Sequence, residues 1–298
     1  MNNIRWTVGL PTDQVESGPD LISADAVAEM AAALEGAGVD ACNVTDHPYP
    51  PRKWVAEGGH HALDPLVTLS FAAAATSRLK LHTNVFVAAY RHPVLSAHAV
   101  ATLDALSGGR VIFGVAVGYL QPEFDALGVE YRRRGAILDD VIARMKAAWA
   151  GEPGPLDNLM RPLPVSPPPI WFGGNSAAAV RRVVTSGQGW VPFPASPALA
   201  RAVRTAPMAN IEDLRLAIVR LRDSAEQAGR SEPIDICVGP FSRAHHLPAP
   251  LEPGRLLGEA AELEAIGVTW LSIRLAAPSR AGYLENVEQF GKEVLGRH

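Results

Sequence analysis

The chain has 298 residues, 48% of them hydrophobic and 19% charged, a composition that indicates a globular protein with a large core. Its formal net charge of −4 argues against binding to nucleic acid or to an anionic membrane, because both require concentrated basic charge. Two cysteines are too few for a disulfide scaffold, the N-terminus lacks the apolar core of a signal peptide, and no apolar run approaches the ~20 residues of a membrane helix. We therefore expect a soluble, cytoplasmic protein that binds neither nucleic acid nor membrane.

Short apolar runs alternate with longer helical patterns from the start of the chain. Ser23 can cap the first long helix, Gly38 ends it, and Pro65 suits the first position of the next helix. In the first half of the chain, strands are predicted over 4–10, 39–45, 79–87 and 110–118, and helices over 23–37, 65–76, 93–106 and 134–150.

The alternation continues after a proline-rich segment, 151–169, which cannot hold a helix or a central strand and is predicted to be an insertion loop. Strands are then predicted over 170–172, 189–193, 234–238 and 268–273, and helices over 176–186, 211–228, 253–265 and 281–295. Eight strand–helix units predict an α/β fold, a (β/α)8 TIM barrel that forms a single domain over 1–298. An open doubly wound sheet is the alternative that the order of elements leaves open.

A barrel of this kind carries its active site at the C-terminal ends of its strands, so the residues that follow the strands are the candidate site. After the second strand, His47 could exchange a proton with a substrate near neutral pH. Alternatively, Asp46 caps the loop and His47 is an ordinary hydrogen-bonded residue. The third strand ends in Thr83, Asn84 and Val85, a stretch that either faces a ligand or simply closes the strand.

Glycines mark the ends of the fourth and fifth strands. Gly118 would let a ligand approach the backbone closely, and Tyr119 beside it could donate a proton. The stretch WFGGNSAAAV, residues 171–180, indicates a strand, a glycine turn and a helix start. Because unpaired N–H groups and a positive dipole end meet at a helix N-terminus, this stretch predicts an anion site. Its candidate residues are Gly173, Gly174, Asn175 and Ser176.

Motifs for several other chemistries are missing from the sequence. There is no G-x-S-x-G elbow, H-E-x-x-H zinc motif, P-loop or G-x-G-x-x-G fingerprint. The histidine pairs at 60–61 and 245–246 stand without other ligands at metal-binding spacing, so no metal site is expected.

Several stretches in a consistent order resemble the luciferase-like monooxygenase superfamily, and more closely its branch that uses the deazaflavin coenzyme F420. They are VTDHPYPP, LDPLVTLSFAAAATSRLKLHTNV, YRHPVLSAHAVATLDALSGGRVIFGVAVGYLQPEFDALGV, RPLPVSPPPIWFGGNSAAAVRR and TSGQGWVPF. Together they cover roughly residues 1–195, and the remainder resembles the family only in general layout.

The resemblance implies a bacterial luciferase-like barrel that often forms a homodimer, with F420 in the strand-end pocket and hydride transfer to or from a small organic substrate. It implies that Asp46 and His47 lie near cofactor and substrate, with His47 the first candidate for the proton step. It also implies a bulged strand at Thr83, Asn84 and Val85, often with a non-prolyl cis peptide, against which the cofactor ring leans. The anion held at the fifth strand would then be the cofactor phosphate.

Some positions depart from the family pattern. Val117 stands where FMN-binding luciferases carry a phosphate-binding arginine, which counts against FMN. Tyr119 stands where some deazaflavin dehydrogenases carry a glutamate acid, and Ala116 and Gln188 replace a common glycine and aspartate. Two alternatives therefore remain beside the F420-dependent oxidoreductase: an FMN-dependent monooxygenase and a flavin-binding barrel without turnover. Aromatic residues in the predicted loops indicate a mainly apolar substrate.

Overall fold

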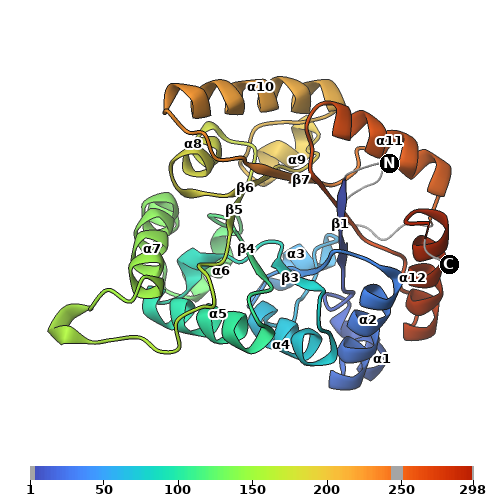
Figure 1. The fold of residues 1–298 in the computed structure, drawn as a ribbon, viewed down its shortest axis with the longest axis horizontal. Helices are drawn as coiled ribbons and strands as arrows, with labels where there is room; N and C mark the ends of the chain where they lie inside the picture. The colour runs from blue at the N-terminus through green and yellow to red at the C-terminus, as the bar shows by residue number, and fades with distance from the viewer. Residues whose placement is uncertain (1–3, 243–250, 297–298) are drawn as a thin grey trace.

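Eight parallel strands close into a barrel in the computed structural model, which describes residues 4–242 and 251–296 (Figure 1). The strands pair in chain order, and β1 closes the barrel against β8 with Arg5 opposite Trp270. Their bounds are β1 Arg5–Gly9, β2 Ala41–Val44, β3 Lys80–Thr83, β4 Val111–Val115, β5 Ile170–Gly173, β6 Gly189–Val191, β7 Asp235–Val238 and β8 Trp270–Ile273. The predicted TIM barrel is confirmed, and the open doubly wound sheet is excluded.

Helices form the outer layer around this barrel (Figure 1). The longer ones are α2 Ala24–Ala37, α4 Pro65–Ala75, α5 Pro93–Ser107, α7 Arg134–Trp149, α8 Ala177–Ser186, α10 Ile211–Gln227, α11 Pro253–Ala265 and α12 Arg280–Glu293. Short helices lie in the connections: α1 Pro19–Ile22, α3 Arg52–Ala56, α6 Gln121–Ala126, α9 Pro197–Ala202, and 3-10 turns at Val15–Ser17, Ala88–Tyr90, Tyr131–Arg133 and Pro155–Asp157.

Local sequence sets the ends of these helices. The Ser23 hydroxyl accepts a hydrogen bond from Ala26 N–H, and the Asp64 carboxylate accepts from the first turn of α4. Gly38 and Gly108 follow α2 and α5 with φ of 85° and 71°, a left-handed conformation that favours glycine. The helix starts at Ser23 and Pro65 are therefore where the sequence predicts them.

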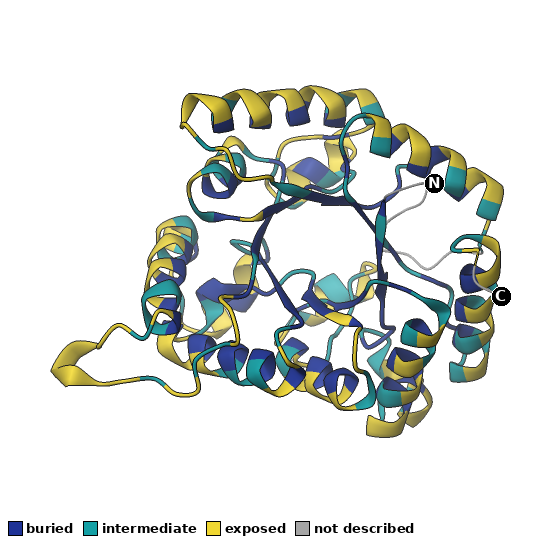
Figure 2. Ribbon diagram, in the orientation of Figure 1, coloured by how far each residue is buried: buried dark blue, intermediate teal, exposed yellow. Residues whose placement is uncertain are grey.

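The core has three parts, and Figure 2 shows most strand residues as buried. The largest part lies between strands and helices, a second fills the barrel interior with Ala41, Ile112, Trp171, Val191, Cys237 and Trp270, and a third joins Val87, Ala89, Phe124 and Tyr131. The Trp171 and Trp270 rings are 5.3 Å apart, and His82 packs 4.9 Å from Trp171. Burial lowers the pKa of His82 to about 3, so His82 is neutral and belongs to this packed interior.

The third strand is shorter than predicted. It ends at Thr83, the Asn84–Val85 peptide bond is cis, and a 3-10 turn follows, whereas the sequence predicts a strand to residue 87. Phe86 returns to bridge Val115, but the next N–H group, that of Val87, donates to the Asp46 carboxylate instead of to a neighbouring strand. A side chain from another unit therefore ends the ladder, and the local apolar pattern does not record it.

The proline-rich segment 151–169 extends away from the barrel as the yellow-green loop at the left of Figure 1. Its only regular element is the 3-10 turn Pro155–Asp157.

In the described part of the chain, no helix combines the length and the apolar character needed to cross a membrane. The histidine pair at 245–246 lies outside the described residues.

Candidate active site

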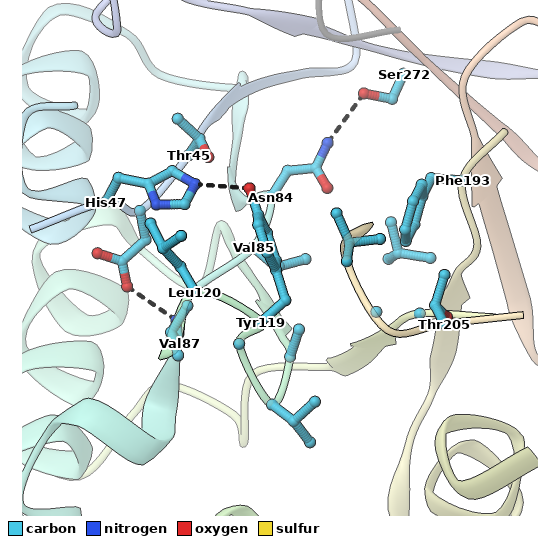
Figure 3. A pocket seen from close by; sticks show the side chains of 18 of the residues that line it. Thr45, His47, Asn84, Val85, Val87, Tyr119, Leu120, Phe193, Thr205 and Ser272 are labelled. Atoms are coloured by element: carbon cyan, nitrogen blue, oxygen red, sulfur yellow. Dashed lines mark hydrogen bonds between the residues drawn. The ribbon is translucent and has the colours of Figure 1, made fainter. Parts of the chain in front are cut away.

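A cavity of about 540 Å³ lies at the C-terminal ends of the strands, where a barrel is expected to hold its ligand. Figure 3 shows His47 and Tyr119 on one side and Phe193 and Thr205 on the other. Of the residues predicted from sequence, those that line the cavity are Asp46, His47, Asn84, Val85, Gly118, Tyr119, Gly173, Gly174 and Ser176. The other two, Thr83 and Asn175, lie behind its wall.

His47 stands at the cavity wall directly after β2, between two polar partners. Its Nδ1 atom is 3.2 Å from Glu123 Oε2, and its Nε2 atom is 3.5 Å from the Tyr119 hydroxyl (Figure 3). Its ring packs 4.7 Å from the Trp54 ring and 5.1 Å from the His60 ring. Only 9% of the side chain is exposed. A histidine held by both nitrogens in a cavity has the geometry of a proton donor or acceptor.

Glu123 is the site residue that sequence reasoning missed. Its carboxylate, on α6, is fully buried and accepts hydrogen bonds from the Tyr90 hydroxyl at 2.9 Å and from Tyr49 N–H at 3.1 Å, in addition to the contact with His47. In the sequence, Glu123 stands in QPEFDALG beside exposed polar residues. The one local hint that Glu123 is buried is that it stands next to the apolar Phe124, which is buried as well.

Two tyrosines beside Glu123 are held in their neutral form. Burial and the negative charge of Glu123 raise the pKa of Tyr119 to about 12. The same two causes, together with the hydrogen bond to Glu123, raise the pKa of Tyr90. Both hydroxyl groups therefore keep their protons near neutral pH, and Tyr119 can act as a hydrogen-bond donor toward the cavity.

Asp46 organises the loop beneath His47. Its buried carboxylate accepts from Val87 N–H at 2.8 Å and from two nitrogens of Arg91 at 2.6 and 2.9 Å. The bidentate ion pair joins the end of β2 to the turn after β3. Asp46 borders the cavity, but both of its carboxylate oxygens already accept hydrogen bonds from protein donors. The geometry therefore displays a structural role for Asp46, which is to hold this loop.

The bulged end of β3 forms the floor of the cavity. Asn84 Nδ2 donates to Ser272 Oγ at 3.0 Å (Figure 3), and the cis peptide bond to Val85 agrees with the family resemblance. Thr83 is fully buried, and its hydroxyl donates to the carbonyl of Gly114 at 2.8 Å. A side chain at Gly114 would meet the Thr83 carbonyl at 2.1 Å, so the two strands approach closely only with glycine there.

The opposite end of the cavity is built by the stretch after β5. Ser176 caps α8 by accepting from Ala179 N–H at 3.2 Å, and Gly174 precedes it with a φ of 110°. Asn175 points away from the cavity, since its amide donates to the carbonyls of Phe193 and Ala206 at 2.9 and 3.1 Å. The predicted strand, glycine turn and helix start are therefore present, with Asn175 as the residue that anchors the turn.

A guanidinium group lies beside this helix start. Arg204 lines the cavity together with Thr205 and Ser176, and its guanidinium carbon is 5.1 Å from the centre of the Tyr131 ring. Its φ of 54° is in the left-handed region, which is uncommon for a residue with a side chain. A positive charge, a helix N-terminus and a hydroxyl group thus line one cavity, a combination that suits an anion.

A second polar group lies on the wall near His47. Asp13 pairs with Arg274, and Asp13 Oδ2 is 4.0 Å from Nδ1 of His60. Asp13 Oδ1 is buried and has no hydrogen-bond partner within residues 4–242 and 251–296. Burial is the main cause that lowers the pKa of His60. These residues can hydrogen-bond a polar group of a ligand, whereas most of the remaining wall is apolar.

A closed parallel barrel with a histidine and a serine-capped helix start in its strand-end cavity has the architecture of a ligand-binding TIM barrel of the enzyme type. The family model of luciferase-like monooxygenases matches residues 6–246. The chain therefore belongs to the luciferase-like monooxygenase family, whose members include oxidoreductases.

Relatives and solved structures of two cofactor types are similar to the chain. An F420-dependent glucose-6-phosphate dehydrogenase from Nakamurella multipartita is 30% identical over 216 residues, which cover 68% of this chain and 59% of that protein. The FMN complex of the oxygenating constituent of 3,6-diketocamphane monooxygenase from Pseudomonas putida superimposes with a TM-score of 0.74 at 14% identity, covering 99% and 98% of the two chains. An F420-dependent secondary alcohol dehydrogenase in complex with an F420–acetone adduct superimposes with a TM-score of 0.72 at 13% identity, and the match covers 99% of each chain. At such low identity, the structural likeness shows the fold alone.

Proposed function

We propose that the protein is an F420-dependent oxidoreductase that moves a hydride between the deazaflavin and a small, mainly apolar organic substrate. The observation that carries this proposal is His47, held between Glu123 and Tyr119 at the strand-end cavity of a luciferase-like barrel. The bound deazaflavin would supply the hydride chemistry. The chain would bind both reactants, exclude water and move the accompanying proton through His47.

The cavity has features that fit a cofactor with a flat ring and a phosphate. Gly118 lines the cavity with a φ of 75°, and it leaves the wall free of a side chain, which would meet Val87 at 2.7 Å. At the other end, Ser176 and the first turn of α8 offer hydrogen-bond donors to a phosphate, and Arg204 adds a positive charge. Asn84 and Val85 would border the ring, as the resemblance implies.

FMN is the alternative cofactor. Val117 lines the cavity where FMN-binding luciferases carry an arginine, which favours F420. The relative that is 30% identical is named as F420-dependent, and this supports the same choice. An FMN complex among the similar folds keeps the monooxygenase as the second candidate.

The substrate that this wall suits is apolar with a single hydroxyl or carbonyl group. Trp54, packed against His47, and Leu120 supply apolar surface to the cavity, and Phe193 supplies more on the side opposite His47. A hydroxyl group that loses a hydride from its carbon must also lose its proton, and His47 is placed to accept it. We also propose that the protein forms a homodimer, as the family resemblance implies, and that it works in the cytoplasm.

Replacing His47 tests the proton step. We expect His47→Ala to lower kcat about 10²- to 10⁴-fold, the usual contribution of a general acid–base group, and to change the Kd for F420 by less than about threefold. The assay follows F420 absorbance with a panel of small secondary alcohols and ketones.

The matched control is His92→Ala, which removes an exposed histidine at the start of α5 and should leave both values unchanged. An unchanged kcat in His47→Ala would remove His47 from the mechanism.

A further inference from the structure

The function proposed so far uses Glu123 only as a contact of His47, although Glu123 is a fully buried charged side chain behind the cavity wall. It is 0% exposed, and the one ion pair that it forms within the described residues is with His47. A buried carboxylate without a basic partner is costly unless hydrogen bonds and a nearby positive charge compensate for it. The surroundings of Glu123 therefore call for an explanation.

We propose that Glu123 is a positioning residue that holds neutral His47 in the Nδ1–H tautomer and stabilises the imidazolium that forms when Nε2 takes a proton. The catalytic consequence rests on the function proposed above, whereas the tautomer does not. Glu123 would thereby determine that Nε2, and not Nδ1, is the ring nitrogen of His47 that accepts a proton.

The hydrogen bonds around Glu123 support this assignment. Oε1 accepts from the N–H group of Tyr49, which can only donate, and Oε2 accepts from the hydroxyl of Tyr90. The neutral state of Tyr90 keeps that hydroxyl a donor. In the ionised form that we propose, the carboxylate can only accept, so the third contact, with His47 Nδ1 at 3.2 Å, is an N–H bond that His47 donates.

The other ring nitrogen then has its lone pair available. Nε2 of His47 points toward the hydroxyl of Tyr119, 3.5 Å away, at the cavity (Figure 3). When Nε2 accepts a substrate proton, the O–H bond breaks, an N–H bond forms, and a positive charge appears on the ring 3.2 Å from the Glu123 carboxylate. The buried Glu123 carboxylate thereby gains a positively charged partner, the imidazolium, when the substrate has given up its proton.

Other titratable groups around His47 are weaker candidates for this role. They are His60, whose ring is 5.1 Å away, Tyr119 and Tyr90, Asp46 with its partner Arg91, and the Asp13–Arg274 pair beyond His60. Asp46 and Asp13 are each paired with an arginine, and Glu123 is the carboxylate among them that is paired with His47.

The tautomer can be measured by two-bond ¹H–¹⁵N NMR on protein labelled with ¹⁵N-histidine, without any cofactor. His47 is assigned by the signals that disappear in His47→Ala. We expect wild-type His47 above its pKa to carry its proton on Nδ1. In Glu123→Gln we expect proton binding to His47 to weaken about tenfold or more, because the carboxylate charge is lost. Asp125→Asn, an exposed change on the same helix, should leave the His47 signals unchanged.

The second readout is kinetic. Glu123→Gln should lower kcat about tenfold or more, move the acidic limb of the kcat profile to lower pH, and leave KM within about threefold. If Glu123→Gln does not fold, the wild-type spectrum still decides, and Tyr90→Phe, which keeps the carboxylate, should retain the Nδ1–H tautomer.

An Nε2–H tautomer in the wild-type protein, or an unchanged His47 titration in folded Glu123→Gln, would overturn the role of Glu123. Absence of F420 turnover together with the expected tautomer would instead overturn the proposed function and leave the role of Glu123 standing. The two failures are therefore distinguishable.

Discussion

Arg204 combines a backbone conformation that favours glycine with a charged side chain at the cavity. It follows α9 at a position where glycine is the usual residue, because its φ of 54° costs a residue with a Cβ atom about 1 kcal/mol. An arginine there keeps a positive charge in the cavity that the start of α8 also lines, where we propose that the cofactor phosphate binds. Backbone strain at a ligand-lining residue indicates that its side chain is needed.

Arg204→Gly should therefore separate stability from binding. We expect the free energy of unfolding to stay the same or rise by up to about 1 kcal/mol, because the left-handed conformation becomes unstrained. The Kd for F420 should rise about tenfold or more, because the phosphate loses a positive charge. Chemical denaturation and fluorescence quenching measure the two quantities.

Arg201→Gly is the matched control, since Arg201 is exposed within α9. It should lower the free energy of unfolding by about 1 kcal/mol and leave cofactor affinity unchanged. Equal affinities for F420 in both variants would mean that Arg204 does not contact the cofactor.

At the residue scale, sequence predicts the groups that stand at strand ends and misses those that arrive from elsewhere. His47 and Tyr119 could be named because they follow β2 and β4 directly. Glu123 could not, because its partners are 33 to 76 residues away and its burial depends on how α6 packs against the turn after β3. Trp54 is one of the aromatic residues in the predicted loops, and nothing in the sequence around it places its ring beside His47.

Among the elements, the β5–α8 unit is the one that the sequence describes best. Its apolar strand, two glycines and Ser176 cap are all encoded within residues 170–177, so local chemistry is sufficient. The end of β3 shows the contrary case. Its ladder ends because Asp46 takes the Val87 N–H group, and no residue within 79–87 records that contact.

A charge at the start of α8 tests the phosphate site. Ser176→Asp should preserve the fold, because aspartate caps a helix as well as serine does, and should raise the Kd for F420 about tenfold or more by repelling the phosphate. Quenching titrations give the Kd, and thermal unfolding checks the fold.

Ser196→Asp makes the same exchange at the N-cap of α9, and it should affect neither affinity nor stability. If Ser176→Asp binds F420 as tightly as the wild-type protein does, the stretch is only a turn.

For the whole molecule, the barrel places both candidate subsites in one cavity. β2 and β4 bring His47 and Tyr119 to one side of it (Figure 3), and β5 leads into the Ser176 helix start, which lines the same cavity. The count of eight strand–helix units was enough to predict this arrangement, because the C-terminal ends of parallel strands meet at one face. The surface of the substrate pocket was not predictable, because it comes from loops whose shape depends on contacts across the barrel.

The central claim is that this cavity is built for F420. A side-by-side fluorescence-quenching titration of the purified protein with F420 and with FMN tests it most directly. The account predicts that F420 binds with a Kd at least about tenfold lower than that of FMN, a difference of about 1.4 kcal/mol. Tight binding of FMN without binding of F420, or binding of neither, would contradict it.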